Sequence, residues 1–153
     1  MRRLSIALCA TQFFPGATPM IAQDSSYDEN ALRVESRLGD LQIVRGTSGT
    51  VVAHAGIFRG PRVADLVSSS DSALAEAKVF ERNYNPGTYM VAAGIALLGA
   101  AIGAGRIPDL NNGIPSGLLA SSVLLIGFGG SKLESAYRGL SKAIWWYNRD
   151  LKR

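Results

Sequence analysis

The chain has 153 residues, enough for one domain or a small domain with an appendage. Hydrophobic residues make up 47% and charged residues only 18%, a composition that excludes disorder over the whole length. One cysteine excludes an intrachain disulfide, and one histidine excludes metal motifs that need two histidines.

The net charge of +4 comes from the two ends of the chain. Residues 131–153 carry six basic and two acidic residues, whereas residues 88–130 carry only Arg106 and Asp109. A basic tail that directly follows an uncharged apolar stretch is typical of a membrane-flanking segment. A nucleic-acid binder instead spreads basic residues, with aromatic residues between them, over a folded face. We therefore expect the lipid bilayer as a partner and no nucleic acid.

Residues 1–22 have the layout of a secretory signal peptide. Two arginines precede an apolar run of 11 residues that ends at Phe14, and a run of that length is too short to cross a bilayer. Cleavage after Ala22 places a small residue at position −1 but Met20 at position −3, where a small side chain is preferred. An uncleaved anchor or a buried helix is the alternative.

The next segment, residues 23–87, is predicted to be a small exported α+β unit. Residues 41–44 and 50–55 are rich in β-branched side chains and flank a glycine-containing turn, which predicts a short β-hairpin. Strong helix formers from residue 72 to about residue 83 predict one helix, and the sequence around Pro86 should end or kink it.

Residues 88–130 predict a transmembrane helical hairpin. Two runs of apolar or small residues, 89–105 and 114–130, flank a polar turn that contains Pro108. Each run is about 17 to 20 residues long, the lower limit for crossing hydrocarbon, and neither shows the polar face of a soluble surface helix. The alternative is a hairpin buried in a soluble core.

Small residues recur at intervals of four in both runs. They would flatten one face of each helix, so that a second backbone can approach closely. The predicted helix-packing residues are Ala92, Ala96, Gly99, Ala100, Gly103, Gly117 and Ser121. Simple alanine richness is the alternative explanation of this pattern.

Residues 131–153 predict a basic amphipathic helix, because apolar residues from Leu133 to Leu151 recur at steps of three and four. This helix would lie along a charged lipid surface, pair with a second helix or fold back onto residues 23–87. The predicted interfacial or partner residues are Tyr137, Leu140, Ile144, Trp145, Trp146 and Tyr147. The expected fold class is thus a mainly α membrane protein, with a transmembrane helical hairpin, an amphipathic C-terminal helix and a small α+β N-terminal segment.

The sequence contains no phosphate-binding loop and no dinucleotide-binding glycine motif. His54 lies in a predicted strand without a cysteine or acidic neighbour in sequence, where a lone histidine is more often structural than catalytic. We therefore predict no catalytic, cofactor-binding or metal-binding residues and no enzymatic activity.

Four stretches carry a resemblance to known proteins: Ile57-Phe58-Arg59-Gly60 through Leu66, the alanine-rich segment 73–80, the Gly/Ala-rich hairpin, and the closing Ala143-Ile144-Trp145-Trp146-Tyr147-Asn148. Over about residues 50–150 the chain resembles a loose group of uncharacterised bacterial envelope proteins. In these, an exported segment precedes two small-residue spans and a tail that ends near Tyr-Asn. The resemblance implies a bacterial origin and a membrane location, and it implies no activity.

These features together predict a non-enzymatic integral protein of the bacterial cell envelope, an accessory or scaffold element of a membrane complex. Its partners would be the lipid bilayer and other membrane or envelope proteins, or a second copy of the chain. The alternatives are a small oligomeric pore or transport component, and a soluble exported binding module whose hairpin is its core. The signal peptide places residues 23–87 and the tail on the periplasmic side of the inner membrane, whereas the positive-inside rule prefers the basic tail in the cytoplasm.

Overall fold

The computed structural model describes residues 25–37, 40–56, 60–107, 111 and 113–152. The elements in chain order are α1 (Ser25–Asn30), β1 (Leu32–Arg37), β2 (Asp40–Arg45), β3 (Thr50–Ala55), α2 (Val63–Leu66), α3 (Asp71–Ala104) and α4 (Gly113–Asp150). The fold is mainly helical, with two long apolar helices and a small antiparallel sheet, as predicted. The predicted signal peptide lies outside the described residues.

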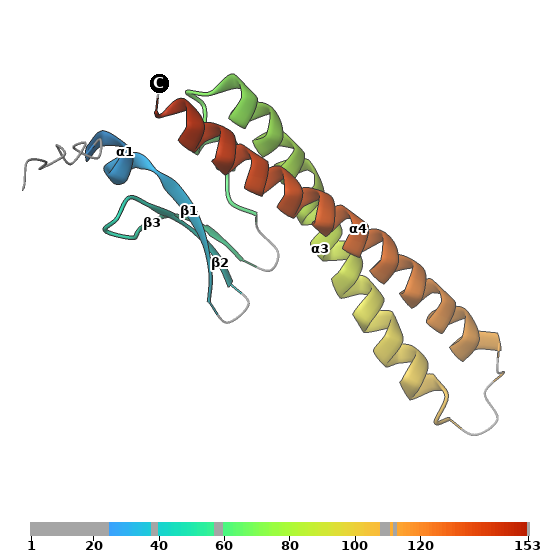
Figure 1. Cartoon of the computed structure of the whole chain (residues 1–153). Coiled ribbons are helices and arrows are strands. Elements are labelled where there is room, and N and C mark those ends of the chain that lie inside the picture. Colours follow the sequence, from blue (N-terminus) through green and yellow to red (C-terminus); the bar gives the residue numbers. More distant parts are fainter. Residues whose placement is uncertain (1–24, 38–39, 57–59, 108–110, 112, 153) are drawn as a thin grey trace, which may run out of the picture.

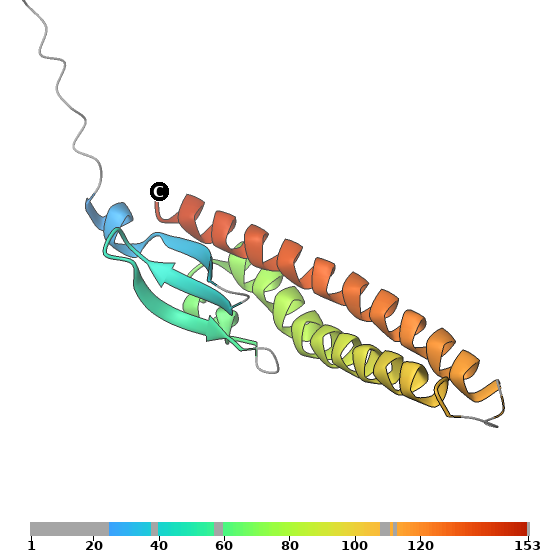
Figure 2. The ribbon, with the colours of Figure 1, turned by 90° about the horizontal axis from the view of Figure 1, so that it is seen from below.

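The two long helices form a hairpin, and the sheet occupies only one end of it. Figure 1 shows α3 running away from the sheet and α4 returning beside it, so that the C-terminus lies next to the sheet. We call residues 71–85 of α3 and 132–150 of α4 the stalk, and residues 86–104 and 113–131 the arm. Figure 2 shows the sheet beside the stalk, with the arm projecting beyond it.

The three strands form an antiparallel sheet in the order β1-β2-β3. The predicted hairpin is present as β2 and β3, and its turn places both Gly46 and Gly49 at a φ of 68°, where residues with a side chain are disfavoured. The sequence left the region of Leu32 undecided between strand and helix, and the structure places it in β1.

One core joins the sheet to the stalk. The strands contribute the buried side chains of Leu32, Ile43 and Ala55 to it. The helical side of this core is formed by Val63, Val67, Ala73, Ala77, Phe80, Tyr84, Ala136, Leu140, Ala143, Ile144 and Tyr147. Burial of these side chains ties residues from β1 to α4 into one body.

Side-chain hydrogen bonds fix the last turns of α4 to the rest of this body. The amide of Asn148 accepts a hydrogen bond from the Leu32 backbone N–H and donates one to the Leu32 carbonyl, both at 2.8 Å. The Ser70 hydroxyl donates to Asp150 Oδ2 at 2.6 Å. Ser70 Oγ also accepts a hydrogen bond from Ala73 N at 3.3 Å, which caps α3. The edge strand and both helix ends are therefore held together.

The helix α3 continues through Pro86, where the sequence predicted an end or a kink. Of these two alternatives the end is wrong, because α3 runs through Pro86 to Ala104. Proline removes one helical hydrogen bond, but packing holds the neighbouring residues in place: Tyr84 is buried, and its hydroxyl donates to the Gly56 carbonyl at 3.2 Å. The boundaries at 87/88 and 130/131 thus fall inside α3 and α4.

In the arm, glycines bring the two helix backbones together. A Cβ on Gly129 would lie 2.8 Å from the carbonyl oxygen of Gly87 and 2.8 Å from the backbone nitrogen of Val91. A Cβ on Gly94 would lie 2.6 Å from Ile126 Cγ1 and 3.0 Å from the Ser122 carbonyl oxygen. Any larger residue at these positions must push the helices apart.

We predict that Gly129→Ala destabilises the hairpin, because the added methyl meets backbone atoms that cannot turn aside. Overpacking of this kind costs about 1–3 kcal/mol. The measurement is the thermal unfolding midpoint in one detergent. The matched control is Gly127→Ala on the same helix, where a Cβ meets nothing within 4 Å, so its midpoint should stay level or rise. Equal midpoints for the two variants would contradict the close contact.

Candidate functional site

The arm carries a large apolar surface that no other described element covers. Both long helices are long and apolar enough to cross a membrane, and only 17% of the apolar window in α3 and 11% of that in α4 is buried. The large exposed side chains of the arm are Tyr89, Ile95, Ile102, Ile114, Leu119, Val123, Leu124 and Phe128. Scattered exposed apolar residues are ordinary, but a continuous patch of this kind marks a lipid or protein contact.

The dimensions of the arm match a bilayer. In α3 the arm, from residue 86 to residue 104, is about 28 Å long at 1.5 Å per residue. In α4 the stretch from residue 113 to residue 131 is about 28 Å long by the same measure. The hydrocarbon core of a membrane is about 30 Å thick. Each helix of the arm is close to the length needed to cross it, and the described residues of the arm carry no charged side chain.

Charged residues mark the level at which the arm meets the stalk. Arg82 ends the charged part of α3, and Lys132 begins that of α4. The Lys132 ammonium donates to Asn83 Oδ1 at 3.3 Å, which joins the two helices at this level. One turn further along α4, Glu134 pairs with Arg138 on the exposed surface. This arrangement is typical of the water-facing end of a transmembrane helix.

The predicted helix-packing residues do not make the contact between α3 and α4. A Cβ on Gly99, Gly103 or Gly117 would meet no atom within 4 Å. Of the other four, Ala92 is half-buried and the remaining three, Ala96, Ala100 and Ser121, are exposed. The prediction of a four-residue repeat as the contact between these helices is therefore corrected.

The observed contact follows a seven-residue repeat instead. Its buried members are Ala73, Phe80, Gly87, Gly94 and Ala101 on α3, and Ser122, Gly129, Ala136 and Ala143 on α4. A step of four residues turns the side chain about 40° off its starting face at each repeat, whereas a step of seven keeps nearly the same direction. We call this contact the heptad seam. The seven-residue spacing is visible in the sequence, and the prediction based on intervals of four residues overlooked it.

The predicted interfacial residues of the tail divide into two groups. Leu140, Ile144 and Tyr147 are buried against the sheet and α3, so the tail folds back, and these three are not a lipid or partner surface. Trp146 packs partly against the same core. Tyr137 and Trp145 are exposed, at 44% and 58% of their surface. These two remain available to a partner.

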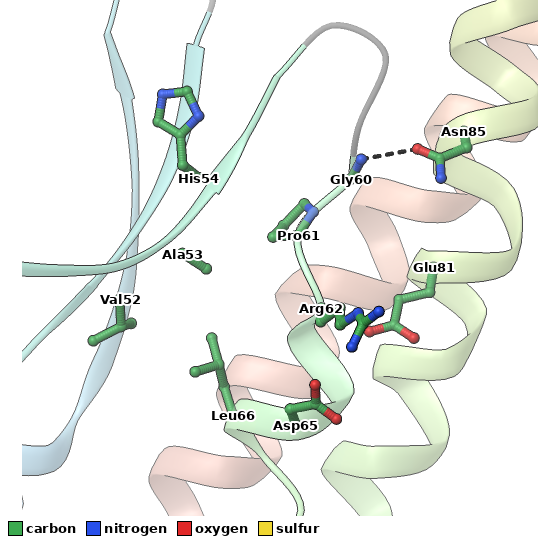
Figure 3. Close-up of a pocket in the computed structure, with 10 residues that line it drawn as sticks. All are labelled: Val52, Ala53, His54, Gly60, Pro61, Arg62, Asp65, Leu66, Glu81 and Asn85. Atoms are coloured by element: carbon green, nitrogen blue, oxygen red, sulfur yellow. Dashed lines mark hydrogen bonds between the residues drawn. The ribbon is translucent and has the colours of Figure 1, made fainter.

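A polar cleft of about 610 Å³ lies between β3, α2 and α3. Figure 3 shows Arg62, Asp65 and Glu81 together on the helical side, with His54 on the strand across from them. Two hydrogen bonds hold the helical wall: Ala64 N donates to Glu81 Oε1 at 2.9 Å, and Gly60 N donates to an oxygen of the Asn85 side chain at 2.8 Å. The cleft thus has a fixed wall with charges of both signs.

The described lining of the cleft combines three charged side chains with one histidine. Its described lining contains no serine, threonine or cysteine that would act as a nucleophile. Across the described ranges, no three His, Cys, Asp or Glu side chains come together in a group that could hold a metal ion. Opposite charges on one wall instead suit a ligand that itself carries both charges.

Comparisons with known proteins leave this geometry as the basis of the functional argument. No protein-family model, no curated protein and no solved structure matches the chain.

Proposed function

We propose that this chain is a non-enzymatic integral protein of the bacterial cell envelope and serves as an accessory or scaffold element of a membrane complex. The arm would be its anchor, and the sheet with the stalk would be its water-facing body. The observation that carries the proposal is the uncovered apolar surface of the arm.

The energetics support lipid around the arm. Removing one large apolar side chain from water is worth about 1.5–3 kcal/mol, and the arm exposes eight such side chains. A soluble binding module with the hairpin as its core would need other segments over these residues. The sheet, α1 and α2 lie at the stalk instead (Figure 1).

The body lies on one side of the membrane in either orientation, because a single core joins the sheet to both halves of the stalk. The signal-like N-terminus favours the periplasmic side of the inner membrane. The positive-inside rule opposes this choice, since Arg82, Lys132 and Arg138 lie on the stalk near the arm. We give the signal more weight, because the rule is statistical.

The body offers a surface for a partner. Trp145 is exposed on the stalk, its ring meets Trp146 edge-on at 4.8 Å, and the Arg149 guanidinium lies 3.8 Å from the Trp146 ring centre. Exposed tryptophan with arginine is the composition enriched at protein contacts. A pore is less well supported, because the described arm has no charged side chain to line an ion path.

Lipid around the arm predicts opposite outcomes for one substitution at two exposed valines. Val123, in the middle of the arm, is 66% exposed, and Val79, on the stalk, is 40% exposed. Lysine at the centre of a membrane helix costs about 2.5–3.5 kcal/mol, whereas lysine in water costs little. After alkaline extraction, the unchanged chain and Val79→Lys should stay in the membrane pellet, and Val123→Lys should be depleted from it. Release of the unchanged chain into the soluble fraction would overturn membrane insertion.

The accessory role predicts a partner at fixed stoichiometry. The chain, purified in a mild detergent, should carry the same membrane protein, or a second copy of itself, through size-exclusion chromatography. Trp145→Ala should lower the amount retained at least about tenfold, as truncation of an interface tryptophan does. The control is Val79→Ala, also exposed on the stalk. A chain that migrates alone from every mild detergent would contradict the accessory role.

A further inference from the structure

We propose that the polar cleft between β3, α2 and α3 binds the ammonium–phosphate headgroup of an aminophospholipid. This inference rests on the proposed insertion of the arm into a membrane, and it assigns a ligand to a site on the water-facing body. Three features of the cleft support this proposal: its charged side chains, the hydrogen bonds that hold part of its wall, and its level along the axis of α3.

The charges of the cleft favour a ligand with an ammonium group. Its described lining holds two carboxylates, Asp65 and Glu81, and one guanidinium, Arg62. A primary ammonium donates charge-assisted hydrogen bonds to carboxylates, and a guanidinium is suited to a phosphate ester. A headgroup with phosphate but no amine would face two carboxylates with one guanidinium to balance them. A headgroup with a trimethylated amine has no N–H to donate.

One of these charged groups, the Glu81 carboxylate, is held in place before any ligand arrives. The hydrogen bond from Ala64 N fixes the Glu81 carboxylate against the first turn of α2, and that from Gly60 N fixes the Asn85 side chain. Arg62 and Asp65 flank this wall with exposed side chains. A site whose groups are held in place loses less entropy when it binds.

The position of the cleft along the axis of α3 favours a lipid headgroup as its ligand. Glu81 and Asn85 lie one turn apart on α3, about 6 Å along the helix axis, and the arm begins at the next residue. The headgroup layer extends about 5–8 Å beyond the hydrocarbon on each side. With the arm in the hydrocarbon, the cleft lies at the level of the lipid headgroups, beside the surface from which this ligand comes.

The test is native mass spectrometry of the full chain in detergent, with phosphatidylethanolamine and phosphatidylcholine of identical acyl chains as probes. The two lipids share the phosphate and differ in the N–H groups of the amine. The unchanged chain should retain phosphatidylethanolamine about tenfold better than phosphatidylcholine, the effect expected for one charge-assisted hydrogen bond. Asp65→Asn and Glu81→Gln should each remove most of this preference, and Arg62→Gln should weaken retention of both lipids.

Two controls make the result specific. Glu81→Gln keeps an acceptor oxygen for Ala64 N, so its thermal midpoint should match that of the unchanged chain. Glu134→Gln removes a carboxylate near the same depth on α4, outside the cleft, and should leave the lipid preference unchanged.

Equal retention of the two lipids, or the same loss in Glu134→Gln as in Glu81→Gln, would overturn the headgroup site. Soluble glycerophosphoethanolamine that competes as well as the lipid at equal concentration would overturn the membrane as the ligand source. If the chain resists alkaline extraction but shows no lipid preference, the headgroup site is wrong and membrane insertion still holds. If alkaline extraction releases the chain, the proposed membrane insertion itself is wrong.

Discussion

The approach of α3 to α4 at Gly129 sets the geometry of the whole molecule. At this point a single methyl group would meet the backbone of the opposite helix. In water, the hydrophobic effect draws helices together whatever their surface, but lipid is as apolar as leucine and gives no such drive. Close backbone packing then supplies the attraction through many small dispersion contacts. The heptad seam provides this packing in the arm.

The heptad seam continues from the arm into the stalk. There the sheet packs beside the helices, and the seam includes a larger side chain. In the arm the seam is built of glycine, alanine and serine, and in the stalk it includes Phe80. Next to Phe80, the ring of Tyr84 lies at 5.1 Å and itself meets Tyr137 edge-on at 6.2 Å. Bulky side chains suit the stalk because the sheet lies over them and removes them from water. One pair of helices thus joins the apolar arm to a folded body without a linker between them.

The coarse architecture was predictable from the sequence, because apolar runs, β-branched runs and capping serines act over short distances. The helical hairpin and strands β2 and β3 follow from such local signals. The continuation of α3 through Pro86 did not follow, since tertiary contacts at Tyr84 and Gly87 outweigh the local preference. Strand β1 depends on pairing with β2 and on Asn148, which is 116 residues away from Leu32. The polar cleft likewise combines residues from three separate elements.

The most direct test of the central claim is the accessibility of the arm to oxygen and to a water-soluble nickel chelate. Spin labels would be placed singly at Ile95, Ile102 and Val123, and at Val79 as the water-exposed reference, in a chain with Cys9→Ser reconstituted into vesicles. Lipid around the arm predicts frequent collisions with oxygen and few with the nickel chelate at the first three sites, with the opposite ratio at Val79. Nickel accessibility in the arm as high as at Val79, or shielding from both reagents, would contradict the account.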